Sequence, residues 1–307
     1  MKIKTKRVFK KASKKMIVAT MILGLVFSSG NFASNKTIEK AQADSSSTSV
    51  TITNALPVAS ATSIDSAAAN VTLTENTTKT VSCVATVTDN NGYADITSVE
   101  ARLYLTTAGA AGAGDSDVRY ILTGDTNCVP SGGSGLTETY TCNFSVQYYA
   151  DPGAWTCQVT PTDTVGAGTA DTDTITVDTL LALDVTASIG YGSMGLGTDT
   201  NTSPITATVT NTGNAIMDPQ VSSAAAMSCT TGTIPIANQE YSATASFDYS
   251  TGTDLSATPT TLNLTLPTPE DTNTPVSAGS YWGILIPANG VEGACTGSNT
   301  FTAVAGT

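Results

Sequence analysis

Acidic and amide side chains gather in one short segment between two stretches of alternating apolar and polar residues. The segment holds Asp89, Asn91 and Asp95. Calcium takes about six to eight oxygen ligands, and carboxylates and amides supply them. The same residue types also cap their own backbone in turns, so an ordinary Asx turn is the alternative interpretation. We expect either a turn or a calcium site here, and no other cofactor is indicated.

Cysteine provides the second kind of chemistry, and an even number in an exported chain predicts disulfides. The six cysteines are Cys83, Cys128, Cys142, Cys157, Cys229 and Cys295. The last two form the natural pair of the C-terminal half. Cys83 and Cys157 each share a strand face with apolar residues, which favours a link between them across a core and leaves Cys128 with Cys142. Cys142 also lies on an apolar phase, so other pairings among these four stay open.

Several catalytic classes are excluded by composition. The chain has no histidine, which removes Ser-His-Asp and Cys-His nucleophiles and histidine ligands for zinc or haem. The segment 190–195 (GYGSMG) has the spacing of a dinucleotide-binding loop, but its Thr- and Gly-rich flanks indicate a plain loop. A glycosidase needs two carboxyl groups in one cleft, usually among aromatic residues, which make up only 6% of the chain. We predict a non-enzymatic protein and assign no catalytic residue.

The first 43 residues are different in character from the rest. A basic stretch precedes an apolar run at 16–27 (MIVATMILGLVF), and a small-residue site (Ala41-Gln42-Ala43) follows. This order predicts a secretory signal peptide over residues 1–43. The spacing between the run and the site is long, so cleavage near residues 28–30, or retention of 16–33 as an anchor, stays open. The apolar run is shorter than the roughly 20 residues that span a bilayer.

Removal of the signal would leave a strongly acidic protein. Residues 1–43 carry ten basic and one acidic side chain, so the net charge of −12 would become −21. The only basic residues that remain are Lys79, Arg102 and Arg119. Nucleic acids require many cationic contacts. We therefore expect no nucleic-acid partner and no membrane span in the mature chain.

Alternation of apolar and polar residues predicts strands through the rest of the chain. The expected strands are 50–53, 70–73, 80–88, 96–105, 118–122, 136–148, 154–160, 174–177, 183–189, 204–211, 241–249, 260–266, 281–286 and 299–304. Turn residues separate them, and no amphipathic helix is predicted after residue 43. Short strands at this spacing are typical of antiparallel β-sandwiches.

The pattern breaks near residues 178–183. We therefore predict an all-β protein with two tandem antiparallel, Ig-like sandwiches after the signal segment. The expected boundaries are 59–179 for the first sandwich and 180–307 for the second. Residues 44–58 would form a flexible lead and a candidate donor strand.

Four motifs carry a family resemblance. They are VSCVATVTDNNGYADITSVE at 81–100, DPGAWT at 151–156, TVTNTGN at 208–214 and GSYWG at 279–283. These resemble turns and strands in the Ig-like or cadherin-like modules of bacterial and archaeal cell-surface proteins. The resemblance implies a β-sandwich fold and an extracellular location, but no single activity.

The expected function is structural or adhesive, at the cell surface. One form is a self-assembling subunit of a filament or surface layer, in which residues 50–56 (VTITNAL) add to a neighbour's sheet edge. The other form is a module that displays binding loops to surface proteins or glycans. A secreted carbohydrate-binding or glycan-hydrolysing protein is the alternative from another class.

Overall fold

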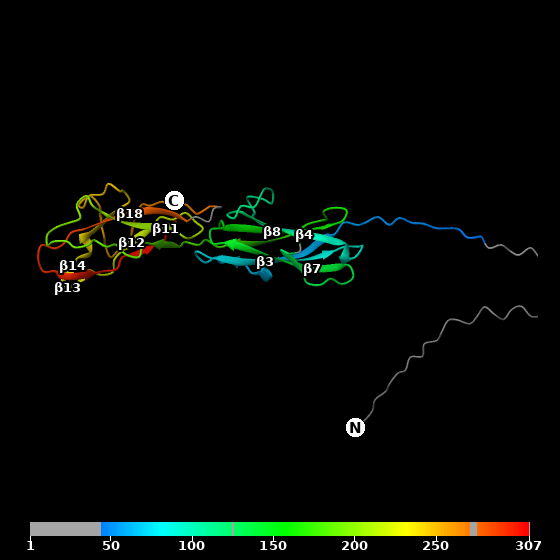
Figure 1. Ribbon diagram of the computed structural model, residues 1–307, viewed down its shortest axis with the longest axis horizontal. Coiled ribbons are helices and arrows are strands. Elements are labelled where there is room, and N and C mark those ends of the chain that lie inside the picture. The colour runs from blue at the N-terminus through cyan, green and yellow to red at the C-terminus, as the bar shows by residue number, and fades with distance from the viewer. Residues whose placement is uncertain (1–43, 125, 271–274, 307) are drawn as a thin grey trace, which may run out of the picture. The chain divides into compact units, whose positions relative to one another are not determined.

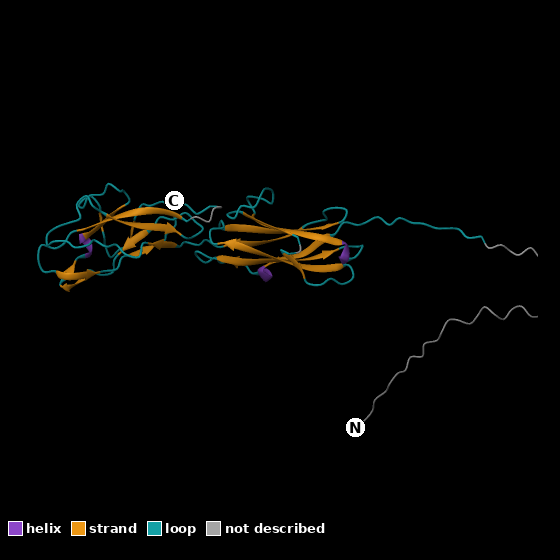
Figure 2. Ribbon diagram, viewed as in Figure 1, coloured by secondary structure: helices purple, strands orange, loops and turns teal. Residues whose placement is uncertain are grey.

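The computed structural model describes residues 44–124, 126–270 and 275–306. The predicted signal segment and its cleavage site lie outside these residues. Strands make up the regular structure, together with three short 3-10 turns at Asp65–Ala67, Tyr93–Asp95 and Ile236–Asn238 (Figures 1 and 2). The all-β prediction is confirmed. No helix in the described ranges has the length and apolar character needed to cross a membrane.

Two sheets lie in the N-terminal half (Figure 1). The four-stranded sheet runs in the order β1 (Val58–Ile64), β3 (Thr78–Thr88), β7 (Thr137–Gln147) and β6 (Cys128–Pro130), with antiparallel pairing throughout. The five-stranded sheet runs β2 (Asn70–Val71), β9 (Asp171–Val177), β8 (Gly153–Asp163), β4 (Ile96–Leu105) and β5 (Arg119–Thr123). Only the short β2–β9 pair of this sheet is parallel.

Alternating residues of both sheets fill a shared core. Every second residue of β3 from Val81 onward is buried, and Trp155 of β8 is completely buried against this face. The Trp155 indole N–H donates to the carbonyl of Asp151 at 2.8 Å, which satisfies its polar atom inside the core. Period-two burial on both layers is the arrangement expected of a sandwich.

Three further sheets lie in the C-terminal half. The first runs β10 (Leu183–Val185), β11 (Ile205–Asn211), β18 (Val276–Ile284), β15 (Gln239–Ser242) and β16 (Thr253–Asp254). The second runs β17 (Thr260–Thr261), β12 (Gln220–Ser222) and β20 (Thr300–Thr302). The third runs β14 (Thr233–Ile234), β13 (Met227–Thr231) and β19 (Glu292–Thr296). A second core cluster, centred on the completely buried Trp282, lies in this half.

The predicted boundary between residues 179 and 180 stays a prediction, and a buried amide lies beside it. Asn214 is fully buried, and its side-chain N–H groups donate to the carbonyls of Ala150 and Asp178. Its side-chain oxygen accepts from the Leu180 N–H at 2.6 Å. One amide thus satisfies three backbone groups from two segments, at residue 150 and at residues 178–180, which no local sequence pattern announces.

The predicted strand at 50–53 is wrong. No residue from 44 to 57 lies in a strand, and the side chains of Val50 and Ile52 are 84% and 81% exposed. Alternation alone does not make a strand, because a strand also needs a neighbour to accept its backbone hydrogen bonds.

Other predicted strands are shorter than expected. The strand predicted at 260–266 ends after Thr261, although Leu262, Leu264 and Leu266 are buried in the predicted phase. The Leu264 N–H donates to the Asp218 carboxylate rather than to a strand carbonyl. Likewise, the strand predicted at 183–189 ends after Val185, as β10, and the strand predicted at 241–249 ends after Ser242, as β15. The alternation correctly predicts which side chains are buried, but not whether a regular ladder forms.

Strand β1 was missed, because its small residues carry little pattern and its pairing with β3 is irregular between Ser60 and Ser63. Ala61 has a positive φ of 52° at this irregularity. Strands β6, β12, β13, β14, β16 and β19 were missed as well. All are short, and several are rich in threonine, glycine or serine, so they lack an apolar alternation to detect.

The three disulfides join the cysteine pairs that the sequence favoured. Cys83–Cys157 links β3 to β8 and so connects the two sheets of the N-terminal half through their core. Cys128–Cys142 links the neighbouring strands β6 and β7, and Cys229–Cys295 links β13 to β19. The first four cysteines are buried, whereas the last two are partly exposed.

This difference in burial predicts the order of reduction. In the folded protein a mild thiol reductant should open Cys229–Cys295 first, because its sulfurs are accessible to an attacking thiolate. The two buried disulfides should open only with unfolding. Alkylation after timed reduction, followed by peptide mass spectrometry, measures the order. The double variant Cys229→Ala, Cys295→Ala is the control and should yield no early thiols. Early alkylation of Cys83 or Cys157 would contradict the prediction.

Candidate functional site

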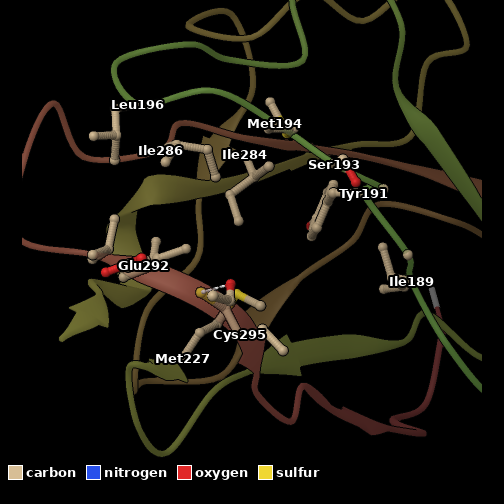
Figure 3. Close-up of a pocket in the computed structure, with 16 residues that line it drawn as sticks. Ile189, Tyr191, Ser193, Met194, Leu196, Met227, Ile284, Ile286, Glu292 and Cys295 are labelled. Carbon is tan, nitrogen blue, oxygen red and sulfur yellow. Dashed lines mark hydrogen bonds between the residues drawn. The ribbon is translucent and has the colours of Figure 1, made fainter. Parts of the chain in front are cut away.

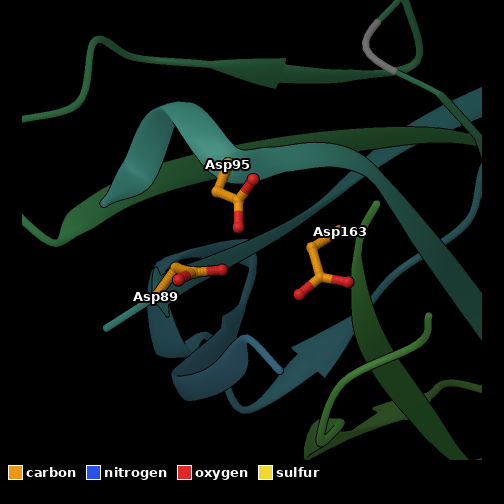
Figure 4. A group of neighbouring side chains, drawn as sticks. All are labelled: Asp89, Asp95 and Asp163. Carbon is orange, nitrogen blue, oxygen red and sulfur yellow. The ribbon is translucent and has the colours of Figure 1, made fainter. Parts of the chain in front are cut away.

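Three carboxylates meet at one end of the N-terminal sandwich (Figure 4). Asp89 follows the last residue of β3, Asp95 closes the 3-10 turn before β4, and Asp163 is the last residue of β8. One ligand oxygen from each lies within 4.8 Å of the others. Figure 4 shows the three carboxyl groups turned toward a common space. The cluster therefore joins two connections that are far apart in sequence.

The turn after β3 fixes the position of Asp89. Its backbone N–H donates to the Leu136 carbonyl, and its Oδ1 accepts from the Asn91 N–H at 2.7 Å. Gly92 has a φ of 122°, a conformation that L-residues rarely adopt, and its N–H donates to the Asp89 carbonyl. These contacts are those of an Asx turn. The second oxygen, Asp89 Oδ2, is buried and has no hydrogen-bond partner within the described part of the chain.

Asp163 is held by backbone and side-chain donors. Its Oδ1 accepts from the N–H groups of Val165 and Gly166, and its Oδ2 accepts from the Asn54 side chain at 2.9 Å. Asp163 is only 4% exposed. The N-terminal lead thus makes direct contact with one member of the cluster.

Two of the three predicted metal-ligating residues, Asp89 and Asp95, lie in this cluster. The third, Asn91, stays a prediction as a ligand, and its Oδ1 accepts from the Ala55 N–H at 2.7 Å. Asp163 was missed because it is remote in sequence. Only the β4–β8 register, which pairs Ile96 with Asp163, brings it beside Asp95.

A second acidic pair has a structural role. Asp171 Oδ2 accepts from the Thr62 N–H at 2.9 Å, and Asp173 Oδ2 accepts from the Ile64 N–H at 3.1 Å. These bonds supply acceptors to β1 where its ladder with β3 is irregular. The backbone hydrogen bond from Thr62 lowers the pKa of Asp171, and burial partly opposes this shift.

The glycine-rich segment 190–195 lines a cavity of about 950 Å³ (Figure 3). Ile189, Tyr191, Met227 and Ile284 contribute apolar surface, and burial raises the pKa of Tyr191, which therefore stays neutral. The segment joins β10 to β11 and begins no helix among the described residues, so the dinucleotide-loop interpretation fails. Glu292 is the only acidic residue in the lining, which does not provide the carboxylate pair of a glycosidase.

No protein-family model and no curated protein matches the chain. Three solved structures resemble it remotely. One is the CsuC–CsuE chaperone–tip adhesion subunit pre-assembly complex from the archaic chaperone-usher Csu pili of Acinetobacter baumannii, with 10% identity and a TM-score of 0.32, over 76% of this chain and 96% of that chain.

The second is the C-terminal domain of the Streptococcus pyogenes antigen I/II-family protein AspA, with 10% identity and a TM-score of 0.25, over 81% of this chain and 98% of that chain. The third is the C-terminal domain of the Streptococcus agalactiae AgI/II polypeptide BspA, with 12% identity and a TM-score of 0.20, over 78% of this chain and 95% of that chain. At such TM-scores, function has to be argued from the residues of this chain.

The Asp171–Thr62 hydrogen bond predicts a pH effect. The folded-state pKa of Asp171 is lowered, so its stabilising contribution is present at neutral pH and is lost as the pH falls through that lowered pKa. Asp171→Asn should reduce the neutral-pH free energy of unfolding by less than about 1 kcal/mol, because the carboxylate is partly exposed. It should also flatten the acid limb of the stability curve.

Urea unfolding between neutral pH and about pH 3 measures this effect. The control is Asp184→Asn, at an exposed aspartate whose Oδ1 accepts from the adjacent Val185 N–H. An identical acid limb in wild type and Asp171→Asn would contradict the prediction.

Proposed function

We propose that the chain is an exported structural or adhesive component of the cell surface, without enzymatic activity. The observation that carries this proposal is that all six cysteines form disulfides, which persist in oxidising compartments outside the cytosol. The strong negative charge beyond residue 43 favours solubility in such a setting.

The arrangement of the disulfides suits a mechanical role. Cys83–Cys157 connects the two sheets of the N-terminal half, so they cannot separate without breaking a covalent bond. Cys128–Cys142 and Cys229–Cys295 each cross-link adjacent strands. A load on one of these strands is therefore shared with a second element. Resistance to separation is the property that a structural or adhesive subunit requires.

Self-assembly through the N-terminal lead is the finer part of the proposal. Residues 50–53 of the segment 50–56 alternate apolar and polar residues, and Val50 and Ile52 are the most exposed large apolar residues of the described chain. Such a segment can add as a strand to the open edge of a sheet in another copy. The sheets offer edges of this kind, since β5 and β10 each end a sheet in the strand order.

If the lead donates a strand, substitutions on its apolar face should impair polymer formation more than substitutions on its polar face. Val50→Asp with Ile52→Asp should abolish polymers, because charged side chains would replace the apolar anchors. Thr51→Asp with Thr53→Asp is the matched control, with the same added charge on the opposite face, and should retain them. Negative-stain electron microscopy and sedimentation of protein exported to an oxidising compartment provide the measurement.

Equal polymerisation by both variants would show that the lead does not donate a strand. Dispersed monomers of the wild-type protein at every concentration would contradict the filament role. They would favour a displayed binding module instead, for which a glycan array is the next measurement.

A further inference from the structure

The carboxylate cluster has an unusual charge environment. Asp89 is fully buried and Asp163 nearly so, and the half-buried Asp95 lies beside them. Three carboxylates in such proximity repel one another, and burial removes the water that would screen them. A cation at the centre would relieve both effects.

Among the residues that the structure describes, no basic side chain fills that role. Lys79 precedes Asp89 by ten residues on the extended strand β3, which places their backbones about 30 Å apart. Arg102 pairs with Glu100 at 2.6 Å, the only ion pair recorded in the described ranges. Arg119 donates to the carbonyls of the 108–114 loop, including Gly109 at 3.2 Å.

A second observation points to a ligand. Asp89 Oδ2 is buried and finds no hydrogen-bond donor in the ranges that the structure describes, although the other oxygen of the same carboxylate is satisfied by the Asn91 N–H. Buried carboxylate oxygens without a partner are rare because their desolvation is not compensated. The carboxyl group faces those of Asp95 and Asp163 (Figure 4).

We propose that Asp89, Asp95 and Asp163 bind a calcium ion. The donor set consists of carboxylate oxygens, which suit a hard cation. Oxygens that share one calcium at about 2.3–2.6 Å can lie up to about 5 Å apart. The ligand oxygens of the cluster, all within 4.8 Å of one another, meet this condition.

The ion would also hold residues 54 and 55, near the C-terminal end of the lead. Asn54 donates to Asp163, and the Ala55 N–H donates to Asn91 in the turn that carries Asp89. Calcium at the cluster would fix both acceptors and thereby order the residues that lead into β1. The binding of calcium does not depend on the proposed surface function.

The test is calorimetric titration of calcium chloride alone into the full chain, with its three disulfides formed and divalent ions first removed by a chelator. We expect one calcium per chain and a higher thermal unfolding midpoint in calcium than in chelator. Asp95→Asn and Asp163→Asn each remove one charge at nearly constant size and should weaken binding by about tenfold or more. The control, Asp184→Asn, should bind as wild type does.

Absence of binding heat together with equal midpoints in calcium and chelator would overturn the proposal. Binding of unchanged affinity to both cluster variants would also overturn it, because the calcium would then lie elsewhere on the acidic surface. An equal rise of the midpoint in magnesium would refute the selectivity for calcium. None of these measurements involves polymers, so the result is independent of the self-assembly experiment.

Discussion

The packing of β3 against β8 is the constraint on which the N-terminal half depends. Cys83 and Cys157 are completely buried at this contact, and their disulfide joins the two sheets covalently. With the layers fixed, the end of β3 and the end of β8 bring Asp89 and Asp163 to the same place. The core and the carboxylate cluster are thus two consequences of the same sheet-to-sheet contact.

Scarcity of basic residues shapes the rest of the structure. Only three basic side chains lie beyond residue 43, and the one ion pair among the described residues, Arg102 with Glu100, neutralises no buried acidic group. Backbone N–H groups serve instead, as Thr62 does for Asp171 and as Val165 does for Asp163. Such hydrogen bonds stabilise ionised carboxylates effectively. Asp89 Oδ2, which has no donor among the described residues, is an exception to this pattern, and it is the oxygen for which we propose a cation.

Strands are predicted correctly from the sequence where a segment of alternating apolar and polar residues also has a neighbouring strand to pair with. Residues 96–105 were predicted as a strand and form β4, because β8 pairs with them from Ile96 to Leu105 and β5 pairs with them from Glu100 to Tyr104. Residues 50–53 have the same alternation without a partner and form no strand. At 260–266 the alternation correctly predicted which side chains are buried. It did not predict that the strand ends early, because the Leu264 N–H donates to the Asp218 side chain and not to a neighbouring strand.

The sequence by itself determined the all-β class, the phase of most buried positions and the favoured cysteine pairs, because a period of two and turn residues are local properties. Tertiary structure alone decided that Asp163 joins Asp89 and Asp95 while Asn91 bonds to Ala55. It also decided that Asn214 satisfies three backbone groups from two segments of the chain. These contacts depend on strand register and sheet order, which arise only when residues distant in sequence pack together.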